Sequence, residues 1–410
     1  MSPVFKKGDR SIPSNYRPVS LTSIVCKQLE HIIVSNILAH CDKYSILSDK
    51  QHGFRRGRSC ETQLAGLVDD LAQILDNRGQ ADLCIMDFSK AFDVAPHQRL
   101  LLKLDHLGIR DNVNRWIENF LTNRSQKVVI DSESSTSADV MSGVPQGTVL
   151  GPLLFLVYIN DLPDCVTSNV RLFADDLILY RQIDSINDCT SLQQDISALC
   201  DWESLRQMKF NKSKCFIMHM THKQKPISYS YLMGDSILQE VKHHPYLGVE
   251  LSHDLSWTKH ISQTVNSANK VLGLLKRNLW NCSPSTKELA YKTLVRPKLE
   301  YASSVWDPHF TTQIDFIENV QQRAARFVKN DYGHTSSVKA MLKDLNWDKL
   351  EIRRTKARLI TLFKESHGFT PSNISHLQIV SSIQRTRSDH ALNYKILSTH
   401  KDRPAAWSSG

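Results

Sequence analysis

The segment "RLFADDLILY", residues 171–180, constrains the fold more than any other, because two adjacent acids interrupt an apolar run. An ionised carboxylate is costly to bury, and two neighbouring carboxylates raise each other's pKa unless a positive charge compensates them. The pattern therefore predicts two strand halves joined by a turn that carries Asp175 and Asp176. A solvated acidic hairpin tip is the competing interpretation, since Asp is common in turns.

A second candidate acid stands at the end of an earlier apolar stretch, "DLCIMDF", residues 82–88. Leu83, Ile85 and Asp87 share one face of the strand that this stretch predicts, so Asp87 ends an apolar row. A strand-end charge or a helix N-cap would also account for Asp87 alone. If the two strand ends meet, Asp87 and Asp175 offer hard oxygen ligands of the kind that Mg²⁺ prefers. Two such ions about 4 Å apart would support in-line displacement at phosphorus.

Length and charge limit the classes of protein to which the chain can belong. With 410 residues, 41% of them hydrophobic, it can form a large core and more than one folding unit. The formal net charge of +9 favours polyanionic partners. The longest apolar run, residues 151–159, is shorter than the roughly 20 residues of a membrane-spanning helix, and residues 1–10 lack the apolar core of a signal peptide. Nine cysteines without a C-x-x-C pair indicate free thiols in a reducing compartment.

The spacing of apolar residues predicts a mixed α/β part up to about residue 250 and a largely helical remainder. Pro96 is expected in the first position of a helix, and Thr148 as the N-cap of a buried helix. The elements expected in the first part are helices over 64–75, 96–107 and 113–121, a hairpin of 127–130 with 138–141, and the buried helix that follows a tight turn at 142–147.

Seven ordered motifs give the sequence a strong resemblance to the reverse transcriptases of non-LTR (LINE-type) retrotransposons, especially the jockey-like ones. The match covers roughly residues 3–330. The motifs are "KKGDRSIPSNYRPVSLTSI", "GFRRGRSCETQL", "MDFSKAFDVAPHQRLLLKL", "SGVPQGTVLGPLLFLVYINDL", "FADD", "NKSKC" and "YLGVEL".

This resemblance implies an α+β protein with the right-hand polymerase fold, in which fingers and thumb flank a palm with a small antiparallel sheet. It places fingers at 1–80, incomplete at the N-terminus relative to the family, and a palm at 81–250 with a finger insertion around 109–140. A helical thumb at 251–330 and a helical C-terminal region at 331–410 follow, and the end of the chain is truncated or atypical for the family.

The resemblance also assigns roles to residues. It implies that Asp87, Asp175 and Asp176 are the catalytic acids and that Asp87, Asp175 and the carbonyl of Phe88 are ligands of two Mg²⁺ ions, for which Mn²⁺ could substitute. The residues implied to bind the deoxynucleoside triphosphate are Lys7, Arg17, Phe92, Gln146 and Lys214. Those implied to contact nucleic acid are Arg55, Arg56, Arg58, Gly147, Tyr246, Leu247 and Gly248.

Several of these assignments have a structural alternative. Phe92, implied to exclude a 2′-OH, could be an ordinary helix-packing residue. Lys7 could belong to a solvated basic loop, Lys214 could be a surface lysine, and the turn that contains Gln146 could be a plain β-turn.

The function implied by the resemblance is that of an RNA-directed DNA polymerase. Its partners would be an RNA template, a DNA primer and deoxynucleoside triphosphates, with the endonuclease supplied elsewhere, no membrane, and a location in both nucleus and cytoplasm. A truncated, catalytically inactive nucleic-acid-binding remnant is the main alternative. A metal-dependent nuclease would share the carboxylates but would not account for Phe92 or Arg17.

Overall fold

The computed structural model describes residues 1–370 and the backbone of two short strands, β16 (Leu377–Ile379) and β17 (Tyr394–Ile396). Its contacts divide the chain into two compact units. The first unit comprises residues 1–56, 82–217 and 227–240, and the second comprises 57–81, 218–226 and 241–410. The chain therefore crosses between the units several times.

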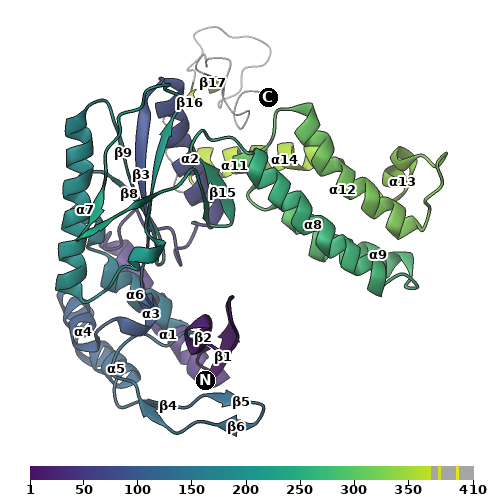
Figure 1. Ribbon diagram of the computed structural model, residues 1–410. Helices are drawn as coiled ribbons and strands as arrows, with labels where there is room; N and C mark the ends of the chain where they lie inside the picture. Colours follow the sequence, from purple (N-terminus) through teal and green to yellow (C-terminus); the bar gives the residue numbers. More distant parts are fainter. Residues whose placement is uncertain (371–376, 380–393, 397–410) are drawn as a thin grey trace. The chain divides into compact units, whose positions relative to one another are not determined.

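The described part of the chain contains a five-stranded sheet in the order β13-β10-β3-β9-β8, most of which lies in the first unit (Figure 1). Its apolar strand β3 is central and almost fully buried, as expected for a near-continuous hydrophobic run. The strands are β3 (Gln80–Asp87), β8 (Asn169–Phe173), β9 (Asp176–Gln182), β10 (Phe216–Thr221) and β13 (Gln239–Glu240).

The predicted antiparallel character of this sheet is only partly right. Strands β8 and β9 are antiparallel, but β10 and β13 are parallel. The segment between β10 and β13 is long enough to return the chain to the same end of the sheet, as a parallel pair requires. It contains a hairpin of β11 (Leu232–Met233) and β12 (Ser236–Ile237), which the pattern analysis did not predict.

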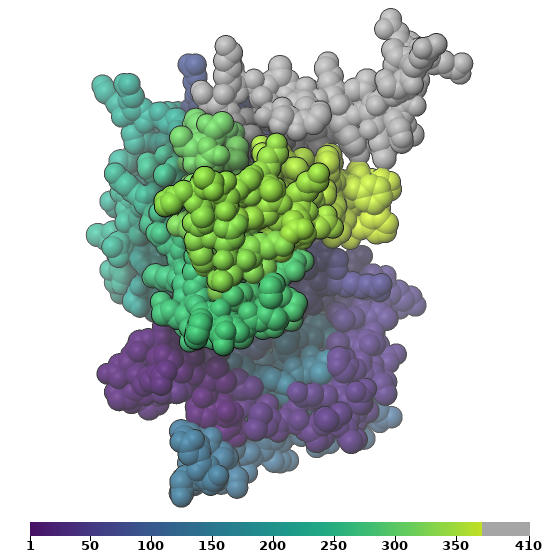
Figure 2. Space-filling model, turned by 90° about the vertical axis from the view of Figure 1, so that its right-hand side faces the viewer, coloured from purple at the N-terminus to yellow at the C-terminus, as the bar shows by residue number. Residues whose placement is uncertain are grey.

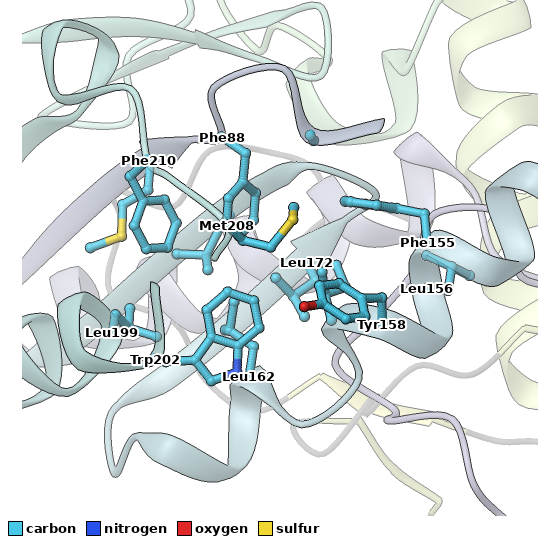
Figure 3. Packing of buried hydrophobic residues seen from close by; sticks show 14 of the residues in the cluster. Phe88, Phe155, Leu156, Tyr158, Leu162, Leu172, Leu199, Trp202, Met208 and Phe210 are labelled. Atoms are coloured by element: carbon cyan, nitrogen blue, oxygen red, sulfur yellow. The ribbon is translucent and has the colours of Figure 1, made fainter. Parts of the chain in front are cut away.

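Helices α6 (Leu150–Ile159) and α7 (Ile186–Arg206) contribute to the core beside the sheet (Figure 1). All residues of α6 except Pro152 are buried, which agrees with the prediction of a buried helix. The N-cap of α6 is Val149 rather than the predicted Thr148, although the Thr148 hydroxyl does accept a hydrogen bond from the Gly151 amide at 3.1 Å. Figure 3 shows the core at close range, with Phe88 beside Phe210 and Trp202.

The remaining elements of the first unit include two corrections to the sequence predictions. Pro96 is the N-cap of α4 rather than its first helical residue. The expected hairpin forms with a different register: 125–126 pair with 138–139, and 129–130 pair with 133–134. These elements are β1 (Ser2–Phe5), β2 (Tyr16–Val19), α1 (Ile24–Lys43), α3 (Ala91–Val94), α4 (His97–His106), α5 (Asp111–Leu121), β4 (Ser125–Gln126), β5 (Val129–Ile130), β6 (Glu133–Ser134) and β7 (Ala138–Asp139).

The second unit is mainly helical, as predicted for the chain after residue 250. Figure 1 shows α8 and α12 running side by side, and Figure 2 shows the surface of this part of the chain in green to yellow-green. Its elements are α2 (Cys60–Asp76), β14 (His243–Tyr246), β15 (Val249–Ser252), α8 (Thr258–Asn278), α9 (Pro284–Ala290), the π-helical turn η4 (Tyr291–Val295), α10 (Arg296–Glu300), α11 (Ser303–Trp306), α12 (Thr311–Lys329), α13 (Val338–Asp344) and α14 (Leu350–Ser366).

The predicted helical region 331–410 contains α13 and α14 and also the antiparallel pair β16–β17. Its other residues after 370 lie outside the described part of the chain. The boundaries predicted between fingers, palm and thumb stay predictions.

Candidate active site

The two adjacent acids lie at the turn between β8 and β9, as the sequence predicted. Phe173 pairs with Asp176, so Ala174 and Asp175 form a two-residue loop. Ala174 has φ +54°, a left-handed conformation that glycine adopts far more readily than alanine. Asp175 therefore stands at the tip of a tight turn, and Asp176 begins the next strand.

Asp87 ends β3, which is adjacent to β9 in the sheet. Its backbone oxygen accepts a hydrogen bond from the Asn211 amide at 2.7 Å. The segment that follows Asn211 places the Lys214 ammonium 2.5 Å from the Asp87 carboxylate. This contact brings together two predicted site residues that are far apart in the sequence.

The three acids influence one another electrostatically. Burial, together with the negative charges of Asp175 and Asp87, raises the pKa of Asp176 to about 6. Burial also raises the pKa of Asp175, and the charge of Asp87 acts in the same direction. The positive charges of Arg17 and Lys214 act on the Asp175 pKa in the opposite direction. The three partly buried carboxyl groups therefore outnumber the two positive groups that act on them.

These residues fit a divalent cation. Carboxylate oxygens are hard ligands, and the excess of negative charge is what such an ion would neutralise. In residues 1–370, no group of three or more His, Cys, Asp or Glu side chains is arranged so that it could hold a metal ion. Mg²⁺ does not require one, because it is usually held by one or two carboxylates together with water and substrate phosphates.

Arg17 lies on β2, where it pairs with Val4 of β1, and its side chain is exposed. Its positive charge acts to lower the pKa of the Asp175 carboxyl. Lys7 lies in the exposed turn after β1. Its neighbour Lys6 acts electrostatically on Asp93, a relation that the sequence analysis missed.

Phe92 is half-buried on α3, and its ring stacks on Phe155 with the centroids 4.4 Å apart. The Phe54 ring lies nearly perpendicular to the same ring, with the centroids 6.3 Å apart. Phe92 therefore packs against the core and is also partly accessible, so the packing role and the sugar-contacting role are compatible.

Gln146 belongs to a loop that is hydrogen-bonded to α3 and to the residue that follows β2. Its side-chain amide donates to Asp93 at 3.0 Å, and its backbone oxygen accepts from the Ser20 amide at 2.8 Å. Gly147 has φ +96°, and a Cβ at this position would lie 2.8 Å from the backbone oxygen of Ser20, the residue after β2, so a side chain would collide with it. This loop thus fixes the backbone near Phe92.

Residues 4–251 match the family model described as "Reverse transcriptase (RNA-dependent DNA polymerase)". The chain belongs to the reverse transcriptase family. As a member, it has the right-hand polymerase fold, and its mixture of helices and sheet confirms the predicted α+β class.

Curated relatives of this reverse transcriptase confirm the resemblance to jockey-like non-LTR elements. One is the RNA-directed DNA polymerase from the mobile element jockey of Drosophila funebris, 28% identical over 83% of this chain and 38% of the relative. Two from Drosophila melanogaster are the probable RNA-directed DNA polymerases from transposon X-element (26%, covering 77% of this chain and 36% of the relative) and transposon BS (27%, covering 87% and 41%). The chain thus spans less than half the length of these relatives.

Solved structures with similarity include a telomerase from Candida albicans in complex with a fragment of telomeric RNA. It is 12% identical, with a TM-score of 0.40 over 78% of this chain and 50% of that chain. The RNA-dependent RNA polymerase of a human picobirnavirus is also 12% identical, with a TM-score of 0.34 over 85% of this chain and 63% of that chain. No helix in the described residues is long and apolar enough to cross a membrane.

The predicted nucleic-acid contacts of this reverse transcriptase are distributed over both units. In the first unit, Arg56 is exposed, whereas Arg55 donates to the carbonyls of Leu47 and Ser48 at 3.2 and 3.0 Å. Arg58 is half-buried in the second unit. These guanidinium groups therefore have different surroundings, although the sequence presents them as one basic cluster.

Tyr246, Leu247 and Gly248 form the tip of the hairpin β14–β15 in the second unit. Leu247 and Gly248 both have positive φ, the pattern of a tight two-residue hairpin turn. Two side chains hold this tip: Tyr301 donates to the Leu247 carbonyl at 2.8 Å, and Gln63 donates to the Tyr246 hydroxyl at 3.1 Å.

Two buried residues near the predicted loops escaped the sequence analysis. The Glu30 carboxylate of α1 accepts hydrogen bonds from the amides of Val149 and Leu150, at 2.6 and 2.9 Å. Gln51 bonds to the Ala174 backbone. A single acid in the mainly apolar stretch 29–34 was a signal for Glu30, whereas nothing in the local pattern distinguishes Gln51.

Proposed function

We propose that the chain is the polymerase part of a non-LTR retrotransposon reverse transcriptase, which extends a DNA primer along an RNA template. The observation that carries this proposal is the grouping of Asp87 and Asp175 with Asp176, close to the charges of Lys214 and Arg17. Two carboxylates at adjacent strand ends, with cations beside them, suit the transfer of a nucleotidyl group.

Asp87 and Asp175, with the backbone carbonyl of Phe88, would hold the divalent ions, and we propose that these are two Mg²⁺ ions. When bound, Mg²⁺ lowers the pKa of a primer 3′-OH and neutralises phosphate charge. Asp176 supports this acidic centre as the first residue of β9.

Other residues of the chain would bind and orient the substrates. The guanidinium of Arg17 suits bidentate contact with a triphosphate. The ammonium of Lys214 can turn from Asp87 to a phosphate oxygen and donate a proton from Nζ to the leaving pyrophosphate. Phe92 would lie against the sugar and exclude a 2′-OH, while Gln146 lies beside it near the new base pair. Lys7 is a further candidate for the triphosphate.

Template and primer would bind through the arginines of residues 55–58 and through the hairpin tip. We assign Arg55, Arg56 and Arg58 to phosphate contacts, which position a nucleic acid without reading its sequence. Gly147 and the hairpin tip at 246–248 are assigned to the primer–template. The DNA end that serves as primer would come from an endonuclease outside this stretch of chain, and we expect function in both a cytoplasmic ribonucleoprotein and the nucleus.

The test is primer extension by the purified chain with Mg²⁺, comparing RNA with DNA templates and deoxynucleotides with ribonucleotides. The proposal predicts metal-dependent extension on RNA by the unaltered protein and none by Asp175→Ala. If both proteins are folded and bind the primer–template but neither extends it, the chain is a non-catalytic nucleic-acid-binding protein. Degradation of the nucleic acid without extension would instead indicate a nuclease.

A further inference from the structure

A short segment of the first unit lies against the strand that leads to the acidic turn. We call residues 50–53 the strap. β8 is the last strand in the order of its sheet, and the strap bonds to it in the manner of a parallel strand. The His52 amide donates to the Leu172 carbonyl at 2.9 Å, and the Leu172 amide donates to the Lys50 carbonyl at 2.9 Å.

The side chain of Gln51 extends this contact into the turn itself. It is buried, with only 3% of its surface exposed. Its Oε1 accepts from the Ala174 amide at 2.9 Å and from the Gly53 amide at 2.7 Å. Its Nε2 lies 3.4 Å from the Ala174 carbonyl oxygen and donates to it. One side chain thus engages both backbone polar groups of Ala174.

The backbone of the strap also approaches Ala174 closely. A Cβ built on Gly53 would lie 2.3 Å from the Ala174 nitrogen. This distance excludes any side chain at position 53, because the neighbouring atom is backbone and cannot move aside independently. The strap therefore holds the turn through two features, the amide of Gln51 and the absence of a side chain at Gly53.

The turn needs such support because of its conformation. Ala174 has φ +54°, and a non-glycine residue keeps a left-handed conformation only when its surroundings hold it there. Asp175 follows directly, so the φ and ψ of Ala174 set the position from which the Asp175 side chain projects. Displacements of about 1 Å at a catalytic group are enough to slow a reaction strongly.

We propose that Gln51 is a positioning residue for the catalytic acids, which fixes Ala174 in its left-handed conformation and so aims Asp175. This inference rests on the proposed polymerase function only for its catalytic consequence. The structural part concerns the turn alone and can be tested whether or not the chain extends primers.

The first measurement is amide hydrogen exchange of the metal-free protein, in peptides that cover residues 171–177. Gln51→Leu has a similar size but neither accepts nor donates, and we expect exchange there to accelerate by roughly tenfold, the equivalent of one hydrogen bond. Gln51→Glu keeps an acceptor for the Ala174 amide but loses the donor to the Ala174 carbonyl, so it should retain part of the protection. Unchanged exchange in Gln51→Leu would overturn the inference.

The second measurement is steady-state incorporation of one deoxynucleotide. In Gln51→Leu, kcat should fall by roughly 10–100-fold, as for other residues that orient a metal ligand, with KM for the nucleotide nearly unchanged. Gln321→Leu is the matched control, since Gln321 is a buried glutamine of α12 whose side chain is also hydrogen-bonded, to Tyr291 and Asp348.

The control separates positioning from general loss of stability. The positioning role would be overturned if kcat fell in both Gln51→Leu and Gln321→Leu, and if each fall simply followed the decrease in the melting temperature of that variant. If the unaltered protein does not extend primers, the polymerase proposal fails, and the exchange experiment still decides whether Gln51 holds the turn.

Discussion

The sequence suggests two roles for Phe92, packing in the core and contact with the sugar of a nucleotide. Its stacking on Phe155 shows that packing is one of its roles. Part of the side chain remains accessible, which a contact with the sugar of a nucleotide requires. Packing and sugar contact make different predictions for variants that affect the same aromatic pair.

We predict that Phe92→Val lowers discrimination against ribonucleotides by roughly 10–200-fold, the range for one small change in the shape of a pocket. Phe155→Leu removes the stacking partner but leaves the Phe92 ring, so it should lower stability more than selectivity. The measurement is the ratio of kcat/KM for a deoxynucleotide and its ribonucleotide. If Phe92→Val and Phe155→Leu lose stability equally and neither changes the ratio of the two kcat/KM values, Phe92 is only a packing residue.

We expect His260 of α8 to make the stability of the second unit depend on pH. The side chain is buried against Trp306, and its Nδ1 accepts a hydrogen bond from the Glu250 amide at 3.2 Å, which requires the neutral ring. Burial lowers the pKa of His260 to about 4, although the negative charge of Glu250 acts to raise it. The ammonium of Lys259 lies 2.5 Å from the Glu250 carboxylate.

The folded state therefore binds fewer protons at His260 than the unfolded state between about pH 4 and pH 6.5, the ordinary histidine pKa. We predict that His260 contributes stability above pH 6.5 that is lost as the pH falls toward 4. His260→Asn keeps an acceptor for the Glu250 amide but cannot be protonated, so its stability should change less over this range. Denaturant unfolding at several pH values tests this, with exposed His31→Asn as the control.

At the scale of elements, α1 contacts the start of α6 through the carboxylate of Glu30. α6 is almost entirely apolar, and its own N-cap residue, Val149, makes no side-chain bond to the helix. Glu30 supplies the missing acceptor for the first amides of α6, where a negative charge also favours the helix dipole. α6 follows the loop of Gln146, so this cap helps to fix that loop.

We predict that Glu30→Gln lowers the free energy of unfolding by about 1 kcal/mol and Glu30→Ala by about 2–3 kcal/mol, because the alanine leaves buried amides without an acceptor. Glu118→Gln on α5 is the control, since Glu118 is exposed and the charge change is the same. Denaturant unfolding would give the two values. A loss in Glu30→Ala no larger than that in Glu118→Gln would show that the cap contributes nothing.

The sequence predicted elements best where one periodicity dominates. The apolar stripes of α2 and α5, the buried strand β3 and the split of "RLFADDLILY" into β8 and β9 all agree with the structure. The register within 125–139 did not follow from the pattern, because these short strands are exposed and have no buried face to set it. The parallel pairing of β13 depends on a tertiary crossover, which local patterns do not record.

The candidate site was predictable to a similar extent. The acids interrupt apolar runs, so Asp87, Asp175 and Asp176 could be found from the sequence, and the NKSKC motif indicated Lys214. Gln51 and Glu30 act through backbone groups more than a hundred residues away in the chain. Such contacts exist only after folding, which is why spacing alone did not predict them.

At the scale of the whole molecule, the match to the reverse transcriptase family covers residues 4–251, which include every residue assigned to the site. The acids, Lys214 and Arg17 all belong to the first unit, and the hairpin tip at 246–248 belongs to the second. A net charge of +9 favours association of the chain with nucleic acid. The central claim is that Asp87 and Asp175 act together as one catalytic centre.

Single-nucleotide incorporation by Asp87→Asn, Asp175→Asn and the double variant tests this claim most directly. Each single variant should lose activity by roughly 100-fold or more, since even outer-shell partners of metal ligands typically contribute 10–100-fold. Residues that act as a unit are not additive, so the double variant should be little worse than either single one. Exposed Asp184→Asn, with the same charge change, should retain activity. Full activity in Asp87→Asn, or losses that multiply in the double variant, would contradict a shared centre.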